Sequence, residues 1–448
     1  MTDLLSRLRD RMPGAGLEGF LRHVWALGAA VHPPPDAPTL AIAGDPDASP
    51  PGAGQWQGAL RAGERLAPHA RDVIAAALAA HPAAARAYTD TVRLGDDGQP
   101  AEVELKPAHD ALFDAARPYA GELALQRVGA APGGPVLHIP YPALLTPHPP
   151  AEGSLAVPEP AHWPRVSVII PSRDAPALIR TVLAGLYERT DYPGLEVIVS
   201  DNGSTDAATL AEYARRGAQG LRVLRHEAPF NFAAQVNRAA AAATGDALLL
   251  LNNDIEIRSA GWLREMVACL AWPGTGIVGA RLLFPDGRLQ HAGAILGLGQ
   301  GYAGHWFAGA PADTPGPVQR LHHRGRLSAV TAAAMLIDRA CWDKTGGMDA
   351  EAFAIAYNDV DFCLRAGAAG FATLWTPYAT LIHHESATRR IASAADRARF
   401  RREKAALRAR HGTERLHDPA LSPWLSREIL PRPRRLTTLP GARLGWAG

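Results

Sequence analysis

The residues best suited to chemistry are three consecutive polar side chains, Asn252, Asn253 and Asp254, which follow an unbroken apolar run at 247–251. Such a run is typical of a strand buried on both faces of a parallel sheet. Open α/β sheets bind their ligands at the carboxyl ends of these strands. A carboxylate beside amide oxygens suits Mg²⁺ or Mn²⁺, which often keep waters and substrate phosphates as further ligands. The stretch therefore predicts a divalent ion that holds a diphosphate, and the alternative is a ligand-free Asn-rich turn.

The segments that must position these residues alternate between apolar strands and amphipathic helices. The pattern predicts strands at 166–170, 195–199, 221–224 and 247–254, with helices between them. Short connections between such units are typical of an α/β fold with a doubly wound, parallel sheet and right-handed crossovers. Because each strand ends in polar residues, the polar ends are expected to gather along one edge of the sheet.

Polar residues at two of these strand and helix ends could contact a nucleotide. Asp201 follows the second strand in a Gly-containing turn, where its carboxylate could accept hydrogen bonds from a nucleobase or ribose. The alternative is a turn in which Asp206 caps the next helix. Asn231 is expected to cap the helix at 231–243, and a helix N-terminus that points at the site would favour phosphate.

Four motifs then occur in a recognisable order: Val168-Ile169-Ile170-Pro171, Asp201-Asn202-Gly203-Ser204-Thr205-Asp206, Asn231-Phe232-Ala233 with Asn237-Arg238, and Thr244-Gly245-Asp246 leading to Asn252-Asn253-Asp254. Together they resemble the family 2 inverting glycosyltransferases of the GT-A fold, especially the rhamnosyltransferase-like branch. The resemblance covers about 165–390. It implies a nucleotide-diphosphate sugar donor held through a divalent metal cofactor, Mn²⁺ or Mg²⁺.

The resemblance implies that Asp254 binds the metal. This sequence departs from the family's Asp-x-Asp motif at its first position, where Asn252 stands. One fewer negative charge there predicts weaker intrinsic metal binding. The candidate nucleotide-sugar-binding residues, from the resemblance and from the strand ends, are Pro171, Ser172, Asp174, Asp201, Asn202, Asn231, Asn237, Arg238, Asn252 and Asn253.

A second acidic motif, Asn358-Asp359-Val360-Asp361, stands where the family usually has Glu-Asp-Val-Asp. The resemblance implies that Asp359 is the general base that removes the proton of the acceptor hydroxyl. Such a base typically contributes about 10²–10⁴-fold to the rate. Asp361 lies off the face of Asp359 and is the expected cap or arginine partner; Asp361 and Thr331 are the alternatives for the base or for an acceptor contact.

His383 and His384 end a strand-like run near the end of the resemblance, where a histidine of related proteins can complete the metal shell. Imidazole is a reasonable ligand for Mn²⁺ and a poor one for Mg²⁺. Because adjacent strand residues face opposite ways, one of the two histidines is expected to face the ion. The sequence leaves open which one it is.

Composition and domain organisation agree with an ordinary globular protein. The 448 residues are 47% hydrophobic and 20% charged with a net charge of +2, which gives no strong field for nucleic acid. The expected regions are a degenerate, non-catalytic GT-A-like α/β region at 1–145, a Pro-rich linker at 146–164, the catalytic domain at 165–390, and a basic helix with a loose tail at 391–448. The first 90 residues are expected to be mostly helical, with one short strand at 40–43.

Three cysteines without metal-ligand spacing indicate free thiols in a reducing cytoplasm. No signal peptide or membrane span is predicted. The basic helix is expected to pack, solvated, on the catalytic domain; peripheral contact with the inner face of the membrane is the alternative.

The sequence thus predicts a metal-assisted, inverting glycosyltransferase that moves a sugar to a saccharide or lipid-linked acceptor in cell-surface polysaccharide synthesis. One alternative is a sugar nucleotidyltransferase, which should carry a Gly-rich phosphate loop near its first strand. Another is a non-catalytic scaffold with a decayed donor site, which the Asn252 and Asn358 replacements keep open.

Overall fold

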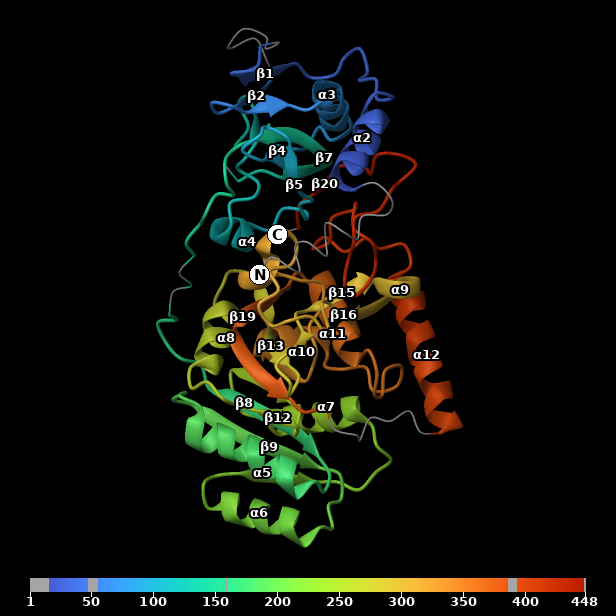
Figure 1. Ribbon diagram of the computed structural model, residues 1–448. Coiled ribbons are helices and arrows are strands. Elements are labelled where there is room, and N and C mark those ends of the chain that lie inside the picture. Colours follow the sequence, from blue (N-terminus) through green and yellow to red (C-terminus); the bar gives the residue numbers. More distant parts are fainter. Residues whose placement is uncertain are drawn as a thin grey trace. The chain divides into compact units, whose positions relative to one another are not determined.

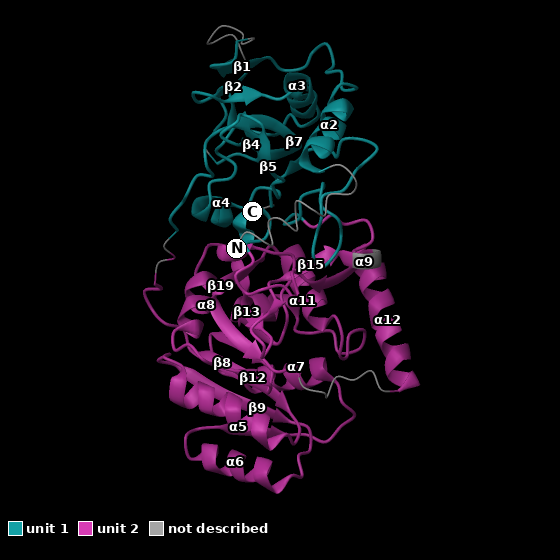
Figure 2. Ribbon diagram, viewed as in Figure 1, with its two compact units in different colours: residues 1–155, 315–320, 419–447 teal, residues 156–314, 321–418, 448 magenta. Residues whose placement is uncertain are grey.

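The computed structural model describes residues 16–46, 55–131, 133–155, 157, 159–385 and 393–446, so the expectations for 1–15 and 386–392 lie outside the described residues. The chain divides into two compact units (Figure 2). Unit 1 comprises residues 1–155, 315–320 and 419–447, and unit 2 comprises residues 156–314, 321–418 and 448.

Unit 2 is built on a ten-stranded sheet whose main path runs β10-β9-β8-β11-β18-β13-β19-β12 (Figure 1). The first four strands on this path are parallel: β10 (Arg222–Arg225), β9 (Leu195–Asp201), β8 (Val166–Ser172) and β11 (Ala247–Leu251). The strand β18 (Ala334–Asp338) runs antiparallel to both of its neighbours, β11 and β13 (Thr275–Leu283). Next come β19 (Ala372–His383), parallel to β13, and β12 (Ile255–Glu256), antiparallel to β19.

The apolar run of β11 is buried at every position, so both faces of the sheet are covered there. The longer helices of unit 2 are α5 (Pro176–Ala184), extended by the π-helical turn η1 (Gly185–Arg189), α6 (Ala207–Gly217), α7 (Phe232–Ala242), α8 (Trp262–Leu270), α10 (Arg339–Thr345), α11 (Asn358–Ala368) and α12 (Ala394–His411). Helix α7 packs on β8 and β9, whereas α8 packs on β13 and β19. The predicted α/β class and the parallel strand–helix repeat are confirmed.

Shorter elements complete unit 2. The strand β14 (Leu289–His291) pairs with β13, and β17 (Gly325–Arg326) pairs with β19. A hairpin joins β15 (Ala294–Gly297) to β16 (Tyr302–His305) through the short helix α9 (Leu298–Gly301). The 3₁₀ segment η2 (Pro317–His322) crosses the boundary between the residue ranges of the two units.

Unit 1 is also an α/β structure, with β4 (Arg86–Leu94) and β7 (Val136–Thr146) as its parallel central pair. Around this pair lie β1 (Leu40–Ala43), β2 (Trp56–Ala59), β3 (Arg65–Leu66), β5 (Pro100–Glu104), β6 (Leu125–Arg127), β20 (Arg443–Leu444) and the helices α2 (Gly16–Gly28), α3 (Ala70–Ala80) and α4 (Ala111–Ala116). The strand at 40–43 is confirmed. The expectation that the first 90 residues are mostly helical is wrong for the described part, where helices cover only 16–28 and 70–80 and the rest is short strands and connections.

The tail expected to be loose is an ordered part of unit 1. Trp424 is fully buried, its indole N–H donates to the carbonyl of Pro140 at 2.7 Å, and its ring meets Phe20 edge-on. The strand β20 pairs with β7. Aromatic burial and strand pairing therefore order a segment whose proline and arginine content predicts a loose chain.

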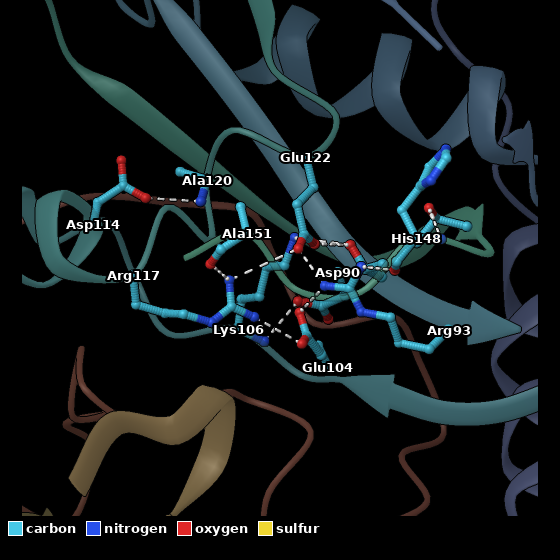
Figure 3. Close-up of polar contacts among 12 residues, drawn as sticks. Asp90, Arg93, Glu104, Lys106, Asp114, Arg117, Ala120, Glu122, His148 and Ala151 are labelled. Atoms are coloured by element: carbon cyan, nitrogen blue, oxygen red, sulfur yellow. Dashed lines mark hydrogen bonds and ion pairs between the residues drawn. The ribbon is translucent and has the colours of Figure 1, made fainter. Parts of the chain in front are cut away.

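Unit 1 contains a buried group of five charged side chains, shown in Figure 3 and called here the unit 1 charge cluster: Arg93, Glu104, Lys106, Arg117 and Glu122. Lys106 Nζ lies 3.0 Å from Glu122, and Arg93 and Arg117 each lie 2.9 Å from Glu104. Burial alone would raise the pKa of Glu122, but Lys106 and Arg93 lower it to about 2. The cluster is therefore an internal ion network in which protein cations neutralise protein carboxylates.

Within the described ranges, we find no helix with the length and apolar character that a membrane crossing requires.

Candidate functional site

The predicted metal-side residues meet where β11 ends. Asp254 Oδ1 lies 3.0 Å from His383 Nε2, and the Asn252 side-chain nitrogen lies 3.4 Å from the same imidazole atom. Pairing of Ile255 with His383 in the β12–β19 ladder brings the two segments together. Asn252, Asp254 and His383 are each less than a tenth exposed, so a small ligand bound between them would be largely shielded from water.

The structure distinguishes the two adjacent histidines. His384 Nε2 lies 2.9 Å from Glu256 Oε2, and its backbone N–H donates to the carbonyl of Asp254. Of the two histidines, His383 is the one that faces the Asp254 carboxylate. This agrees with the alternation of side chains along a strand, which predicted that one of the pair would face the site.

The Asp254 and His383 pair fits a divalent ion in the type of its donor atoms. A carboxylate oxygen and an imidazole nitrogen are suitable Mn²⁺ ligands, and diphosphate oxygens and water would supply the remaining positions. Among the residues that the structure describes, no group of three His, Cys, Asp or Glu side chains forms a complete metal cage.

The predicted base, Asp359, lies at the start of α11. Its Oδ2 accepts a hydrogen bond from the Ala332 backbone N–H at 3.2 Å, and its Oδ1 accepts one from Val360 at 2.9 Å. The adjoining residue, Ala333, accepts a hydrogen bond at its carbonyl from the Asn252 backbone N–H at 3.0 Å. The segment that holds Asp359 is thus directly bonded to the end of β11, so the metal-side residues and the predicted base belong to one connected set.

The two alternatives to Asp359 have other contacts. Asp361 is fully buried and accepts from Arg365 at 2.7 Å, from Arg410 at 2.9 Å and from His411 at 2.8 Å. Burial alone would raise the pKa of the Asp361 carboxyl, but these donors hold it below its ordinary value. Thr331 Oγ1 accepts from the Ala333 backbone at 3.3 Å. Asp361 therefore serves as the arginine partner that the sequence predicted.

Asp174, after β8, and Asp201, at the end of β9, both accept hydrogen bonds from the loop at 204–206. Asp201 is 1% exposed, accepts from the Ser204 backbone at 3.0 Å and from the Tyr213 hydroxyl at 3.2 Å, and also bonds the Ser204 hydroxyl. Asp174 is more open and accepts from the backbones of Thr205 and Asp206, which hold its pKa below the ordinary value. The Asp174 carboxylate is thus more accessible to a nucleoside than the Asp201 carboxylate.

Three neighbours of this loop lie close together. The Asn202 backbone N–H donates to the Ser172 carbonyl at 2.9 Å, and the Asn253 amide donates to the Ser172 hydroxyl at 3.1 Å. Pro171 precedes Ser172 near the end of β8. This places the predicted nucleoside residues beside the strand end that carries Asp254. Asp206 caps α6 through the Thr209 N–H, as expected.

The predicted residues on α7 differ in role. Asn231 caps the helix by accepting from Ala234 at 2.9 Å. Asn237 donates to the Met348 carbonyl at 2.7 Å and accepts from the Met348 N–H at 2.9 Å, so both ends of its amide are bonded to the protein backbone. Arg238 is half-buried, and its Nη1 has no hydrogen-bond partner among the described residues. Of these three residues, Arg238 has the most free capacity for a ligand.

Gln290 and His291 are two buried neighbours on β14 to which the sequence analysis assigned no role. Gln290 Oε1 lies 2.6 Å from His383 Nδ1, and the Thr331 backbone N–H donates to His291 Nε2 at 3.3 Å. Burial, with His305 and His383 nearby, holds the pKa of His291 well below its ordinary value, which keeps the ring neutral. The sequence signal at this place is the run Leu289-Gln290-His291-Ala292-Gly293 after a turn at 285–287, which by itself indicates no role.

Comparison with known proteins gives one family and several relatives. Residues 167–301 match the family model described as "Glycosyl transferase family 2". An uncharacterized protein, y4gI, from Sinorhizobium fredii is 40% identical over 341 residues, covering 73% of this chain and 36% of that protein. The O-antigen biosynthesis protein RfbC of Myxococcus xanthus is 39% identical over 228 residues, covering 51% of this chain and 18% of that protein.

A further relative is the N-acetylglucosaminyl-diphospho-decaprenol L-rhamnosyltransferase of Mycobacterium tuberculosis, 27% identical over 46% of this chain and 71% of that protein. Among solved structures, the mannosyltransferase PcManGT from Pyrobaculum calidifontis, in complex with GDP-Man and Mn²⁺, is 20% identical. It covers 59% of this chain and 69% of that chain at a TM-score of 0.43. The chain spans about a third or less of the first two curated relatives.

Proposed function

We propose that unit 2 transfers a sugar from a nucleotide-diphosphate sugar to a saccharide or lipid-linked acceptor, because residues 167–301 match the glycosyl transferase family 2 model. The proposal extends to cell-surface polysaccharide synthesis, since one relative is named for O-antigen biosynthesis and another for rhamnosyl transfer to a lipid-linked sugar. The observation that carries it is the connected set in which the end of β11 bonds to the segment holding Asp359.

Asp254 and His383 would hold the divalent ion, with Asn252 beside them. When bound, the ion supplies positive charge against the negative charge that develops on the leaving diphosphate. Asp174 and Ser172 would contact the nucleoside, and Arg238 would place its guanidinium near the phosphates. In this arrangement the protein supplies one carboxylate, one imidazole and one cation to a strongly anionic donor.

Asp359 would accept the proton of the acceptor hydroxyl while that oxygen forms a bond to the anomeric carbon. The bond from the anomeric carbon to the diphosphate oxygen breaks at the same time, and its electron pair leaves with the diphosphate. Attack from the face opposite the leaving group inverts the anomeric configuration. The two backbone N–H groups that Asp359 accepts fix its orientation and still leave each oxygen a lone pair for the incoming proton.

Two alternatives make different predictions. A sugar nucleotidyltransferase would release pyrophosphate, and the family match counts against it. A scaffold with a decayed site would bind the donor without turnover. Asn358 is one of the two residues that depart from the family motifs. Its side-chain N–H donates to the Ile355 carbonyl at 3.0 Å, so Asn358 ties the start of α11 to the preceding segment.

For the basic helix α12 we propose a structural role in place of membrane contact. Glu403 accepts from the Ile355 and Ala356 backbones at 3.1 Å each, and Arg410 reaches Asp361 on α11. These contacts hold both the approach to α11 and its first turn. Use of a nucleotide-sugar donor would place the reaction on the cytoplasmic side.

The test is to incubate the purified chain with UDP-, GDP- and dTDP-sugars and Mn²⁺, and to measure released nucleoside diphosphate, pyrophosphate and the anomeric configuration of any product. We expect slow donor hydrolysis that releases nucleoside diphosphate and depends on Mn²⁺, and an inverted product when an acceptor is present. Pyrophosphate release would support the nucleotidyltransferase. Donor binding without any turnover would support the scaffold.

A further inference from the structure

The short strand β14 contains a bulge at the centre of the site. Leu289 pairs with Leu283 and His291 pairs with Leu282, so Gln290 is the extra residue between two consecutive partners. A bulge leaves one residue unpaired in the ladder and re-aims its side chain, and bulges are frequent next to active sites. Gln290 and His291 are 5% and 1% exposed, so both side chains are directed into the protein.

The bulged residue determines which nitrogen of His383 carries the proton. Gln290 donates its amide N–H to Glu385 Oε2 at 3.3 Å, which orients the amide so that its oxygen faces His383 Nδ1 at 2.6 Å. An amide oxygen only accepts, so Nδ1 carries the hydrogen. A ring that binds a metal through Nε2 needs its hydrogen on Nδ1, and Nε2 is the atom that faces Asp254 at 3.0 Å. This is the tautomer that a metal ligand requires.

The next residue acts on the other side of the site. His291 Nε2 accepts the Thr331 N–H at 3.3 Å, and the neighbouring Ala332 N–H donates to Asp359 Oδ2 at 3.2 Å. His291 Nδ1 lies 3.0 Å from His305 Nδ1. A neutral His291 that accepts at Nε2 carries its proton at Nδ1 and donates it to His305. The ring is therefore fixed at both nitrogens, and it fixes the segment that orients Asp359.

We propose that the bulged strand β14 is a shared positioning element, in which Gln290 presets His383 for a divalent ion and His291 sets the segment that orients Asp359. The proposal rests on the proposed function of unit 2. Neither residue touches the reacting atoms; each acts through another residue. The bulge thereby fixes the position of His383 on the metal side of the site relative to Asp359 on the base side.

The test uses two variants, one expected to change metal affinity and the other expected to change turnover. Gln290→Met keeps the length of the side chain and removes the acceptor; we expect Mn²⁺ affinity, measured from the free Mn²⁺ signal in electron paramagnetic resonance with a nucleoside diphosphate present, to fall about 10–100-fold. Gln290→Glu keeps an acceptor and should stay closer to the wild type. His291→Leu should leave Mn²⁺ affinity unchanged and lower kcat by on the order of 10–100-fold, and His291→Gln, which restores an acceptor, should recover part of it.

Arg288→Ala is the matched control, because Arg288 adjoins β14 and its guanidinium pairs with the exposed Asp286, away from His383 and Asp359 in the hydrogen bonds described. It should change neither readout. If the wild type binds Mn²⁺ and turns over donor but Gln290→Met matches it in Mn²⁺ affinity, the positioning role is wrong and the proposed function stands. If the wild type neither binds Mn²⁺ with any nucleoside diphosphate nor turns over donor, the proposed function itself fails. Should Gln290→Met not fold, Gln290→Glu and Gln290→Leu replace it, and equal Mn²⁺ affinity in those two would equally overturn the proposal.

Discussion

Each unit contains a carboxylate beside an imidazole, and the two pairs have different surroundings. In unit 1, Asp90 Oδ1 lies 2.8 Å from His138 Nε2 and both side chains are fully buried. In unit 2, Asp254 and His383 lie 3.0 Å apart at a strand end, with side chains about a tenth exposed. The separations are nearly equal, so the difference between the units lies in what else reaches each pair.

The pair in unit 1 is enclosed by protein groups. Asp90 Oδ1 also accepts the Lys106 backbone N–H at 2.9 Å, and the Lys106 ammonium belongs to the unit 1 charge cluster (Figure 3). Burial lowers the pKa of His138 against the opposing pull of Asp90. In unit 2 the second imidazole nitrogen is held by a neutral amide, Gln290. The comparison teaches that the pair in unit 1 is fully buried, with Lys106 and Arg443 acting electrostatically on His138, whereas the pair in unit 2 lies at a strand end and keeps some exposure. We propose on this basis that unit 1 is non-catalytic.

The largest expected effect separates the units by activity. Asp359→Asn should lower kcat by about 10²–10⁴-fold, because the amide cannot accept the proton of the acceptor hydroxyl. Asp90→Asn, the corresponding carboxylate-to-amide change in unit 1, should leave kcat of the folded protein unchanged. Steady-state kinetics on both variants checks this. Equal losses in the two would remove the distinction between the units.

The second effect concerns stability. Glu122→Gln leaves Lys106 and Arg93 with one fewer buried counter-charge, and breaking a buried ion pair by removing one partner costs about 3–5 kcal/mol. Urea unfolding should show this loss in the transition that includes unit 1. The control is Glu18→Gln, which removes an exposed pair with Arg22 and should cost about 0–1 kcal/mol. A small effect from Glu122→Gln would show that the cluster is solvated.

A smaller effect distinguishes the adjacent histidines. His383→Ala should weaken Mn²⁺ binding by at least about 10–100-fold, as for loss of a group that directly supports a metal. His384→Ala removes only a contact with Glu256 and should leave the affinity nearly unchanged. Titration of Mn²⁺ in the presence of a nucleoside diphosphate gives both numbers. The reverse order would place His384 at the ion.

The smallest effect is a pH dependence of unit 1. The pKa of Glu122 lies near 2, below the ordinary value of a glutamate, because Lys106 and Arg93 outweigh the effect of burial. A carboxyl with a lowered pKa contributes stability above its unfolded pKa, and that contribution is lost as the pH falls toward 2. Urea midpoints measured from pH 7 to pH 3 should therefore fall less steeply in Glu122→Gln than in the wild type. Parallel curves would contradict the assignment.

Local patterns in the sequence predicted the parts of the site that local patterns determine. The apolar run of β11, the caps at Asp206 and Asn231, and the alternation of His383 with His384 all depend on residues close together in the chain. These predictions agree with the structure. The roles assigned to individual ligand residues stay predictions, because contacts with the protein alone do not test them.

The features missed by the sequence depend on pairing between distant segments. The bulge at Gln290 exists only relative to β13, and the contacts of Asp174 with the backbones of Thr205 and Asp206 form only once two strand ends lie together. The tail expected to be loose is ordered because Trp424 is buried in unit 1. The first 90 residues were expected to be mostly helical, but in the described part helices occupy only 16–28 and 70–80.

The most direct test of the central claim is thermal unfolding with nucleoside diphosphates, with and without Mn²⁺, on the wild type, Asp254→Asn and Asp90→Asn. Ligand that binds only the folded state at 100 times its Kd stabilises by about 2.7 kcal/mol. We predict Mn²⁺-dependent stabilisation of the wild type by at least one nucleotide, the same stabilisation in Asp90→Asn, and its loss in Asp254→Asn. Full stabilisation of Asp254→Asn, or its loss in a folded Asp90→Asn, would contradict the account.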